Sequence, residues 1–412
     1  MLNEIGRRAK EAEKILACAD SSVKNRALIR ISEMLIEKGD VILTANKKDT
    51  RTARINKMPE SLVDRLALDE SRIRAMAKGA ADIAAMNDPV GRVIGGSVRP
   101  NGLKIEKVAV PLGVMAVIYE ARPNVTADAA ELCLKSGNSV ILRGGKEAVF
   151  SNIAIANIMR DALVSVGLPA DCIQLIEDTT RESAAELMRL NEYVDVLIPR
   201  GGAGLIKACV ENSTVPVIET GTGNCHVFVD KSADADMAQK IIVNAKTSRP
   251  SVCNACESLL FHKDFPQSDV KDILKALKDK GVKIRGDETI KGIFPAAEEA
   301  DESDWGTEYL DMIISAKIVS DIDEAISHIS KYGTHHSECI VTENYFSAEK
   351  FKAQVDAAAV YVNASTRFTD GSEFGFGAEI GISTQKLHAR GPLGLENLTS
   401  EKYVISGCGQ IR

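Results

Sequence analysis

Residues 114–143 read VMAVIYEARPNVTADAAELCLKSGNSVILR. Two short apolar runs, 114–119 and 140–143, flank a helical stretch at 126–136. A strand, a helix and a second strand in this order form a βαβ unit, in which the two strands lie parallel in one sheet. The stretch therefore predicts an α/β protein built around a parallel sheet.

The same alternation continues along the chain. Further strands are expected at 173–176, 194–198 and 215–219, with helices at 148–166, 180–190 and 202–211. Five strands in this order predict a doubly wound nucleotide-binding domain. Before it, the spacing of apolar residues predicts helices at 22–38, 40–55 and 70–86, and a turn signal at 99–102 followed by period-two alternation predicts a hairpin at 97–110.

Residues 227–365 repeat the pattern and predict a second α/β domain. Helices are expected at 234–247, 267–280, 321–331 and 346–356, and strands at 258–261, 311–318, 338–342 and 360–363. The Gly-rich segment 367–394 reads as loop. The tail, 402–406, reads as a strand with no local partner.

Composition narrows the class of protein. The 412 residues are 45% hydrophobic and 26% charged, which fits a globular protein and excludes a disordered chain. The net charge of −7 and the 4% of aromatic residues argue against nucleic acid and membrane surfaces as partners. The N-terminus lacks the apolar region of a signal peptide, and the nine scattered cysteines fit reduced thiols, so we expect a cytoplasmic protein.

Cys253 is the candidate nucleophile. It lies in Arg249-Pro-Ser-Val-Cys-Asn-Ala-Cys-Glu257, where a loop is expected to lead into a helix. A thiol at a helix N-terminus feels the positive end of the helix dipole, which lowers its pKa. Cys253 and Cys256 also form a CxxC, which leaves a redox or zinc role open. The adjacent His335 and His336 point to opposite faces of a strand and are expected to be structural.

Glycine-rich loops mark a nucleotide site. They lie at 143–145, 200–204 and 221–223, each after an expected strand. Ligands bind at the carboxyl ends of the strands in open α/β sheets. There is no P-loop motif and no well-placed G-x-G-x-x-G. The residues alone therefore predict an α/β enzyme that binds a nucleotide and uses a cysteine.

Several segments together resemble the aldehyde dehydrogenase superfamily, most closely its branch that reduces acyl phosphates. Glu219 and Cys253 stand 253 − 219 = 34 positions apart, similar to the superfamily's glutamate and nucleophile. The segments that carry the resemblance are 111–124, 137–148, 198–204, 325–340, 373–383 and 387–395.

The resemblance implies an aldehyde dehydrogenase-like fold with two doubly wound, Rossmann-like domains and a small β domain. Residues 1–96 and 111–226 would bind NADP, and 227–365 would carry the nucleophile. The strands at 97–110 and 395–412 would mediate oligomerisation. The loop 366–394 would close the active site.

The implied reaction is the NADPH-dependent reduction of L-glutamate 5-phosphate to L-glutamate 5-semialdehyde and phosphate, the second step of proline biosynthesis from glutamate. Cys253 would attack the acyl phosphate, and Asn124 would stabilise the oxyanion. Glu219 would position groups or move a proton, and Arg122 would bind substrate. No metal is expected.

The resemblance also assigns cofactor residues and partners. Arg143 and Lys146 would meet the adenosine ribose and favour NADPH, because two cations attract a 2′-phosphate. Gly201 and Gly202 would lie near the pyrophosphate and Glu308 near the nicotinamide ribose, and Thr220 would also bind the cofactor. A homo-oligomer and functional coupling to glutamate 5-kinase are expected.

Two alternatives stay open. The first is a dehydrogenase that oxidises a free aldehyde to an acid with NAD or NADP. The second, of another class, is a thiol or zinc module built on the CxxC of residues 253–256.

Overall fold

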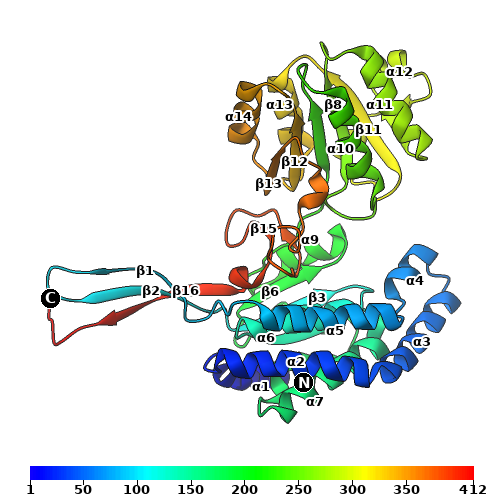
Figure 1. Cartoon of the computed structure of the whole chain (residues 1–412). Helices are drawn as coiled ribbons and strands as arrows, with labels where there is room; N and C mark the ends of the chain where they lie inside the picture. Colours follow the sequence, from blue (N-terminus) through cyan, green and yellow to red (C-terminus); the bar gives the residue numbers. More distant parts are fainter. The chain divides into compact units, whose positions relative to one another are not determined.

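The computed structural model describes residues 1–412, apart from the side chain of Ser61, and divides into two compact units. Unit 1 comprises residues 1–220, 375–381 and 393–412, and unit 2 comprises 221–374 and 382–392. Each unit has its own parallel sheet with helices around it (Figure 1). None of the helices among the described residues is long and apolar enough to cross a bilayer.

Five helices open unit 1, and the three that the sequence predicts are confirmed. Helix α2 packs against α5 and buries Leu28, Ile31 and Leu35 completely. Asp69 caps α5 by accepting a hydrogen bond from the Arg72 N–H. The helices are α1 (Leu2–Leu16), α2 (Ser21–Glu37), α3 (Gly39–Ile55), α4 (Glu60–Leu66) and α5 (Glu70–Ala85).

The unit 1 sheet has the strand order β5-β4-β3-β6. Every residue of β3 is buried, as expected of a central strand covered on both faces. The strands are β3 (Val114–Tyr119), β4 (Ser139–Gly144), β5 (Ile173–Leu175) and β6 (Val196–Arg200). The connecting helices are α6 (Asn124–Lys135), α7 (Val149–Ser165), α8 (Arg181–Leu187) and α9 (Ala203–Asn212), with short turns η1 (Lys146–Ala148) and η2 (Ala170–Cys172).

The fifth strand predicted at 215–219 is wrong. Only Val217 makes a bridge, to Leu197. The carbonyl of Pro216 accepts from the Leu197 N–H at 2.8 Å, but a proline has no N–H to extend the ladder. The apolar run is therefore an extended segment beside β6.

A separate antiparallel sheet joins β1 (Val93–Val98), β2 (Lys104–Pro111) and β16 (Thr399–Ser406) in the order β1-β2-β16. The tail strand pairs with β2 from Thr399 opposite Pro111 to Ser406 opposite Lys104. Figure 1 shows β16, in red, beside β2. The strand that lacks a local partner in the sequence thus pairs with the hairpin. The turn η5 (Leu395–Leu398) precedes it.

Unit 2 holds a seven-stranded parallel sheet in the order β10-β9-β11-β8-β7-β12-β13. Its strands are β7 (Cys225–Val229), β8 (Cys256–His262), β9 (Lys283–Gly286), β10 (Glu298–Glu299), β11 (Ile313–Val319), β12 (Ser337–Val341) and β13 (Ala359–Val362). Its helices are α10 (Ala235–Thr247), α11 (Gln267–Asp279), α12 (Glu288–Ile293), α13 (Ile322–Tyr332) and α14 (Tyr345–Gln354). Shorter elements are η3 (Asp304–Gly306), η4 (Thr366–Phe368), β14 (Ile382–Ser383) and β15 (Gly391–Pro392).

The four predicted helices and four predicted strands of unit 2 are present, but the sequence reading missed β7, β9, β10 and α12. Strand β9 reads Lys-Ile-Arg-Gly and shows no apolar run. In β7 a cysteine and a histidine are buried beside three apolar residues. Polar residues in short buried strands hide the pattern that identifies a strand.

Candidate active site

Cys253 lies in the turn between α10 and β8 of unit 2, and its residue is half-buried. Strand β8 begins three residues later, so the prediction of a helix after Cys253 is wrong. The reason is the run Glu257-Ser-Leu-Leu-Phe-His262, all buried, which enters the middle of the sheet. A following helix dipole therefore does not act on this thiol.

The backbone of the Cys253 turn is held by two segments distant in sequence. The Asn254 amide nitrogen donates to the carbonyl oxygen of Thr369 at 2.9 Å, and the hydroxyl of Thr366 donates to the Asn254 carbonyl at 2.7 Å. On the other side, a Cβ atom at Gly223 would overlap the Cys253 carbonyl. Two hydrogen bonds and one close backbone contact therefore hold the turn from two sides.

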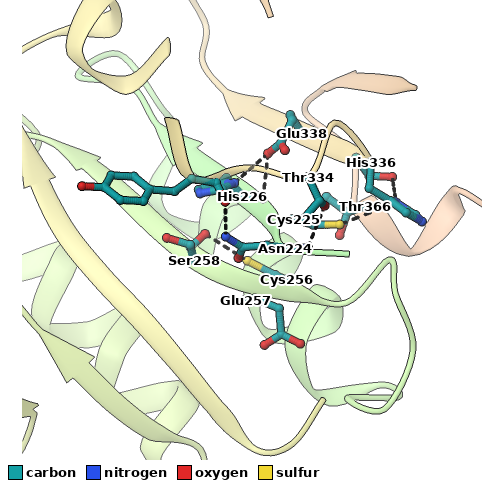
Figure 2. Close-up of polar contacts among 12 residues, drawn as sticks. Asn224, Cys225, His226, Cys256, Glu257, Ser258, Thr334, His336, Glu338 and Thr366 are labelled. Carbon is teal, nitrogen blue, oxygen red and sulfur yellow. Dashed lines mark hydrogen bonds and ion pairs between the residues drawn. The ribbon is translucent and has the colours of Figure 1, made fainter. Parts of the chain in front are cut away.

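A buried polar layer supports the turn (Figure 2). The Cys225 thiol donates to the Cys253 carbonyl oxygen at 3.1 Å. Next to it, the Glu338 carboxylate accepts from the backbone N–H of His226 at 2.8 Å and lies 3.0 Å from its Nδ1. Burial lowers the pKa of His336 to about 4, so that ring is neutral at pH 7. The layer is a scaffold rather than a second reactive centre.

The three neighbouring thiols are not equivalent. All nine cysteines are in the thiol form, but Cys225 and Cys256 are fully buried whereas Cys253 is half-buried. Burial raises the pKa of the Cys225 and Cys256 thiols above the ordinary value. Among the described residues, no group of three His, Cys, Asp or Glu side chains is placed to hold a metal ion. Cys253 is therefore the thiol that a substrate can reach.

Asn124 is the first residue of α6 in unit 1. Its amide nitrogen donates to the Asp128 carboxylate at 2.8 Å, one helical turn further on. An amide nitrogen carries two N–H donors, so the second can serve a ligand. Burial raises the pKa of Asp128 to about 6, although the Asn124 hydrogen bond and the charge of Arg200 oppose that rise. The orientation of the Asn124 amide thus depends on an acidic side chain of the same helix.

Glu131 lies on the same face of α6. It is fully buried, and among the described residues neither of its carboxylate oxygens has a hydrogen-bond partner. Burial, helped by the charge of Asp128, raises its pKa well above the ordinary value. Glu131 is therefore a buried acid whose surroundings favour its neutral form.

The two expected adenosine cations differ in their surroundings. Arg143, in β4, is half-buried, and its Nη2 donates to the carbonyl oxygens of Thr179 and Thr180, both at 2.7 Å. It thereby holds the loop before α8. Lys146 is exposed at the first residue of η1. Arg143 is the second-last residue of β4 and Lys146 lies two residues after the strand, so both are at its carboxyl end, where a ligand of an open sheet binds.

Gly201 and Gly202 connect β6 to α9. The Gly202 N–H donates to the Glu120 carboxylate at 2.9 Å, and a Cβ at Gly201 would lie only 2.6 Å from that carboxylate. A carboxylate at a helix N-terminus is an anion in the place that the helix dipole favours. Thr220 is buried, and its hydroxyl donates to the Pro199 carbonyl at 2.8 Å.

Glu308 in unit 2 accepts from the Gly223 N–H at 2.6 Å, and burial raises its pKa. Two residues on, the Leu310 N–H donates to Glu257 at 3.2 Å, and Glu257 pairs with Lys246 at 2.5 Å. Both partners of this pair are fully buried. Burial raises the pKa of Glu257 to about 7, against the opposing charge of Lys246. The pair ties the Glu308 segment to α10 and β8.

The sequence reading missed the Lys246–Glu257 pair, although a signal is present. Lys246 continues the buried stripe of α10, which contains Ala238, Ile241, Ile242 and Ala245. A lysine at that spacing needs a buried acid as partner. The two remaining predicted site residues, Arg122 and Glu219, lie in unit 1. Arg122 is exposed just before α6, and Glu219 is half-buried in the segment after Val217.

Comparison with known proteins identifies the family. The model of the "Aldehyde dehydrogenase family" matches residues 3–292. A gamma-glutamyl phosphate reductase of Clostridium perfringens (strain SM101 / Type A) is 60% identical over 415 residues, covering 100% of both chains. The crystal structure of gamma-glutamyl phosphate reductase from Thermotoga maritima superimposes with a TM-score of 0.98 at 51% identity, covering 99% of both chains.

More distant structures share the fold. An acetylating aldehyde dehydrogenase from Geobacillus thermoglucosidasius matches with a TM-score of 0.70 at 19% identity, covering 99% of this chain and 97% of that one. The predicted aldehyde dehydrogenase-like α/β fold, with its separate small sheet, is confirmed. The chain therefore belongs to the aldehyde dehydrogenase family and groups there with the gamma-glutamyl phosphate reductases.

Proposed function

We propose that this chain is an enzyme that reduces L-glutamate 5-phosphate to L-glutamate 5-semialdehyde and phosphate, the second step of proline biosynthesis from glutamate. The observation that carries the proposal is the accessible Cys253 thiol on a turn fixed from both sides, in a chain 60% identical over its full length to a gamma-glutamyl phosphate reductase.

Cys253 performs the first step. Its thiolate attacks carbon 5 of the substrate, a C–S bond forms, and the C–O bond to phosphate breaks with its electron pair leaving on phosphate. The oxygen of the tetrahedral intermediate becomes negative, and the Asn124 amide and the Cys253 backbone N–H donate to it. The fixed turn keeps this N–H aimed in one direction. The result is a thioester on Cys253 and inorganic phosphate.

The second step releases the aldehyde. The hydride that reduces the thioester would come from a nicotinamide cofactor when one is bound. The hemithioacetal oxyanion on Cys253 then collapses, the C–S bond breaks, and the thiolate is restored. Because phosphate accepts the acyl group in the reverse direction, no activated water is required. We therefore assign a positioning role to the half-buried Glu219, and a substrate-binding role to the exposed Arg122.

The residues after β4 and β6 fit a dinucleotide cofactor. A Cβ atom at Gly201 would collide with the Glu120 carboxylate, and the N–H of Gly202, directly before α9, already binds that anion. The Thr220 hydroxyl is hydrogen-bonded to the carbonyl of Pro199, near the end of β6. Arg143 and Lys146 would hold the adenosine end and Glu308 the nicotinamide ribose. Two cations at the adenosine end support NADPH over NADH.

The cofactor assignment is tested by Lys146→Glu. Loss of a charged contact costs about 1–3 kcal/mol, so the KM for NADPH should rise roughly ten- to a hundredfold. The KM for NADH should change far less, because NADH has no 2′-phosphate. Lys14→Glu, on the exposed side of α1, is the matched control. An equal rise in KM for both cofactors would show that Lys146 does not bind the 2′-phosphate.

The reaction itself is tested in the reverse direction. Purified protein with glutamate semialdehyde and NADP⁺ should reduce NADP⁺ only when phosphate is present. Reduction without phosphate would contradict the proposal and favour the dehydrogenase that oxidises a free aldehyde. Phosphate-dependent turnover that persists after Cys253→Ala would favour a different chemistry altogether.

Assembly as a homo-oligomer is a further part of the proposal. The two edges of the small sheet, β1 and β16, are exposed along nearly their whole lengths, and β16 carries the exposed hydrophobic residues Tyr403, Val404 and Ile405. An uncovered apolar edge strand is a pairing surface. Removal of residues 400–412 should lower the mass measured by light scattering; an unchanged mass would contradict this role. Functional coupling to glutamate 5-kinase and a cytoplasmic location remain predictions.

A further inference from the structure

Two arginines flank the turn that carries Cys253. Arg367, from η4, donates through Nε to the Ser248 hydroxyl at 3.1 Å, and its Nη1 contacts the side-chain oxygen of Asn254. Ser248 directly precedes Arg249, and Asn254 directly follows Cys253. The guanidinium of Arg367 therefore joins the two ends of the turn that presents the thiol.

Arg249 adds a second positive charge to the Cys253 turn. Burial lowers the pKa of the half-buried Arg367, and the charge of the exposed Arg249 lowers it further. Asp370 and the Cys253 thiolate act in the opposite direction. The position of Arg367 near the thiol follows from its contact with Asn254, which directly follows Cys253. Asp370 balances only one of the two positive charges of Arg249 and Arg367, so a further anion beside them would be attracted. This part of unit 2 is thus suited to an anionic ligand.

The chemistry of the reaction says which anion comes closest. In an acyl phosphate, the phosphorus is joined through a single oxygen to the carbon that the thiolate attacks. The α-carboxylate of the same substrate is separated from that carbon by three further carbon atoms. Arginine presents paired N–H donors that match two phosphate oxygens. A cation attached to the neighbours of Cys253 is therefore better placed for the phosphoryl group.

We propose that Arg367, together with Arg249, binds the phosphoryl group of the acyl phosphate and holds it as the leaving group while the thioester forms. In the reverse direction the same pair binds inorganic phosphate for attack on the thioester. The positive charge also stabilises the Cys253 thiolate, a task that no following helix performs here. This inference rests on the proposed function.

The test uses the reverse reaction, because phosphate is then a separate substrate with its own KM. Arg367→Gln and Arg249→Gln should each raise the KM for phosphate about ten- to a hundredfold, the range for loss of a charge-assisted hydrogen bond. The KM for glutamate semialdehyde should stay within about threefold. Arg367→Lys should recover part of the loss. Lys271→Gln, an exposed charge on α11, is the matched control.

A second readout does not depend on turnover. Inorganic phosphate should slow the alkylation of Cys253 by iodoacetamide, measured on the Cys253 peptide by mass spectrometry. The exposed Arg249 can be replaced without disturbing the fold, and Arg249→Gln should weaken this protection.

Three outcomes overturn the inference. The first is a wild-type protein that needs no phosphate, which also defeats the proposed function. The second is phosphate-dependent wild-type turnover with an unchanged phosphate KM in both glutamine variants, which defeats this inference alone. The third is a raised KM for the semialdehyde with an unchanged KM for phosphate, which would make the pair a site for the α-carboxylate.

Discussion

Asn124 in unit 1 and Cys253 in unit 2 are held by different means. The Asn124 amide is oriented by Asp128, four residues along the same helix. The Cys253 turn is held by Thr366, Arg367 and Thr369, which lie more than a hundred positions away in sequence. The first arrangement is local and can be read from helical spacing. The second exists only once unit 2 has folded.

The charges around the two residues are also opposite. Asp128 and Glu131 line one face of α6, and burial raises the pKa of both. Arg249 and Arg367 flank the Cys253 turn. An acid can orient an amide donor by accepting from it, whereas a nucleophilic thiolate needs nearby positive charge. The environment of each residue therefore matches its proposed task.

The largest expected effect comes from the thiol. Cys253→Ala should abolish turnover, because the other two thiols near the turn, those of Cys225 and Cys256, are fully buried, while NADPH binding measured by fluorescence should persist. Cys256→Ala should keep most activity, since its thiol is buried at the start of β8. An inactive Cys256→Ala combined with an active Cys253→Ala would show that Cys256, and not Cys253, is the nucleophile.

The next effect concerns the local arrangement in unit 1. Asn124→Ala should lower kcat by about a hundred- to a thousandfold, the usual range for loss of one oxyanion donor. The KM for NADPH should hardly change. Steady-state kinetics with each substrate varied in turn would show this. A normal kcat would mean that other groups stabilise the oxyanion. Asn124 would then not be a catalytic residue comparable with Cys253.

The alternation of strands and helices predicted most of the fold because each element buries its own apolar run, as β3 does. The prediction failed where the apolar pattern of a segment does not decide its structure. Pro216 stops a fifth strand in unit 1, and the approach to Cys253 leads into β8 because its following residues complete the centre of a sheet. The partners of the turn, such as Arg367, were not predictable, since their approach depends on how unit 2 folds.

The smallest effect is the stability change from Asp128, and its size depends on pH. The folded-state pKa is about 6, above the ordinary value of 3.8, because burial disfavours the charged form. The folded protein therefore holds this proton more tightly than the unfolded chain does. Stability falls as pH rises between these two values and the full cost, roughly 1–3 kcal/mol, is present above pH 6.

Asp128→Asn removes that cost but keeps an oxygen that can accept from Asn124. The urea midpoint of the variant should therefore exceed that of the wild type at pH 7.5, and the two should converge near pH 4. The kcat should fall by less than for Asn124→Ala, because a neutral acceptor orients the amide more weakly than a carboxylate does. Glu186→Gln, an exposed acid on α8, should show no such convergence. If Asp128→Asn were less stable than the wild type at pH 7.5, the contribution of the ionised carboxylate to its hydrogen bond with Asn124 would outweigh its burial.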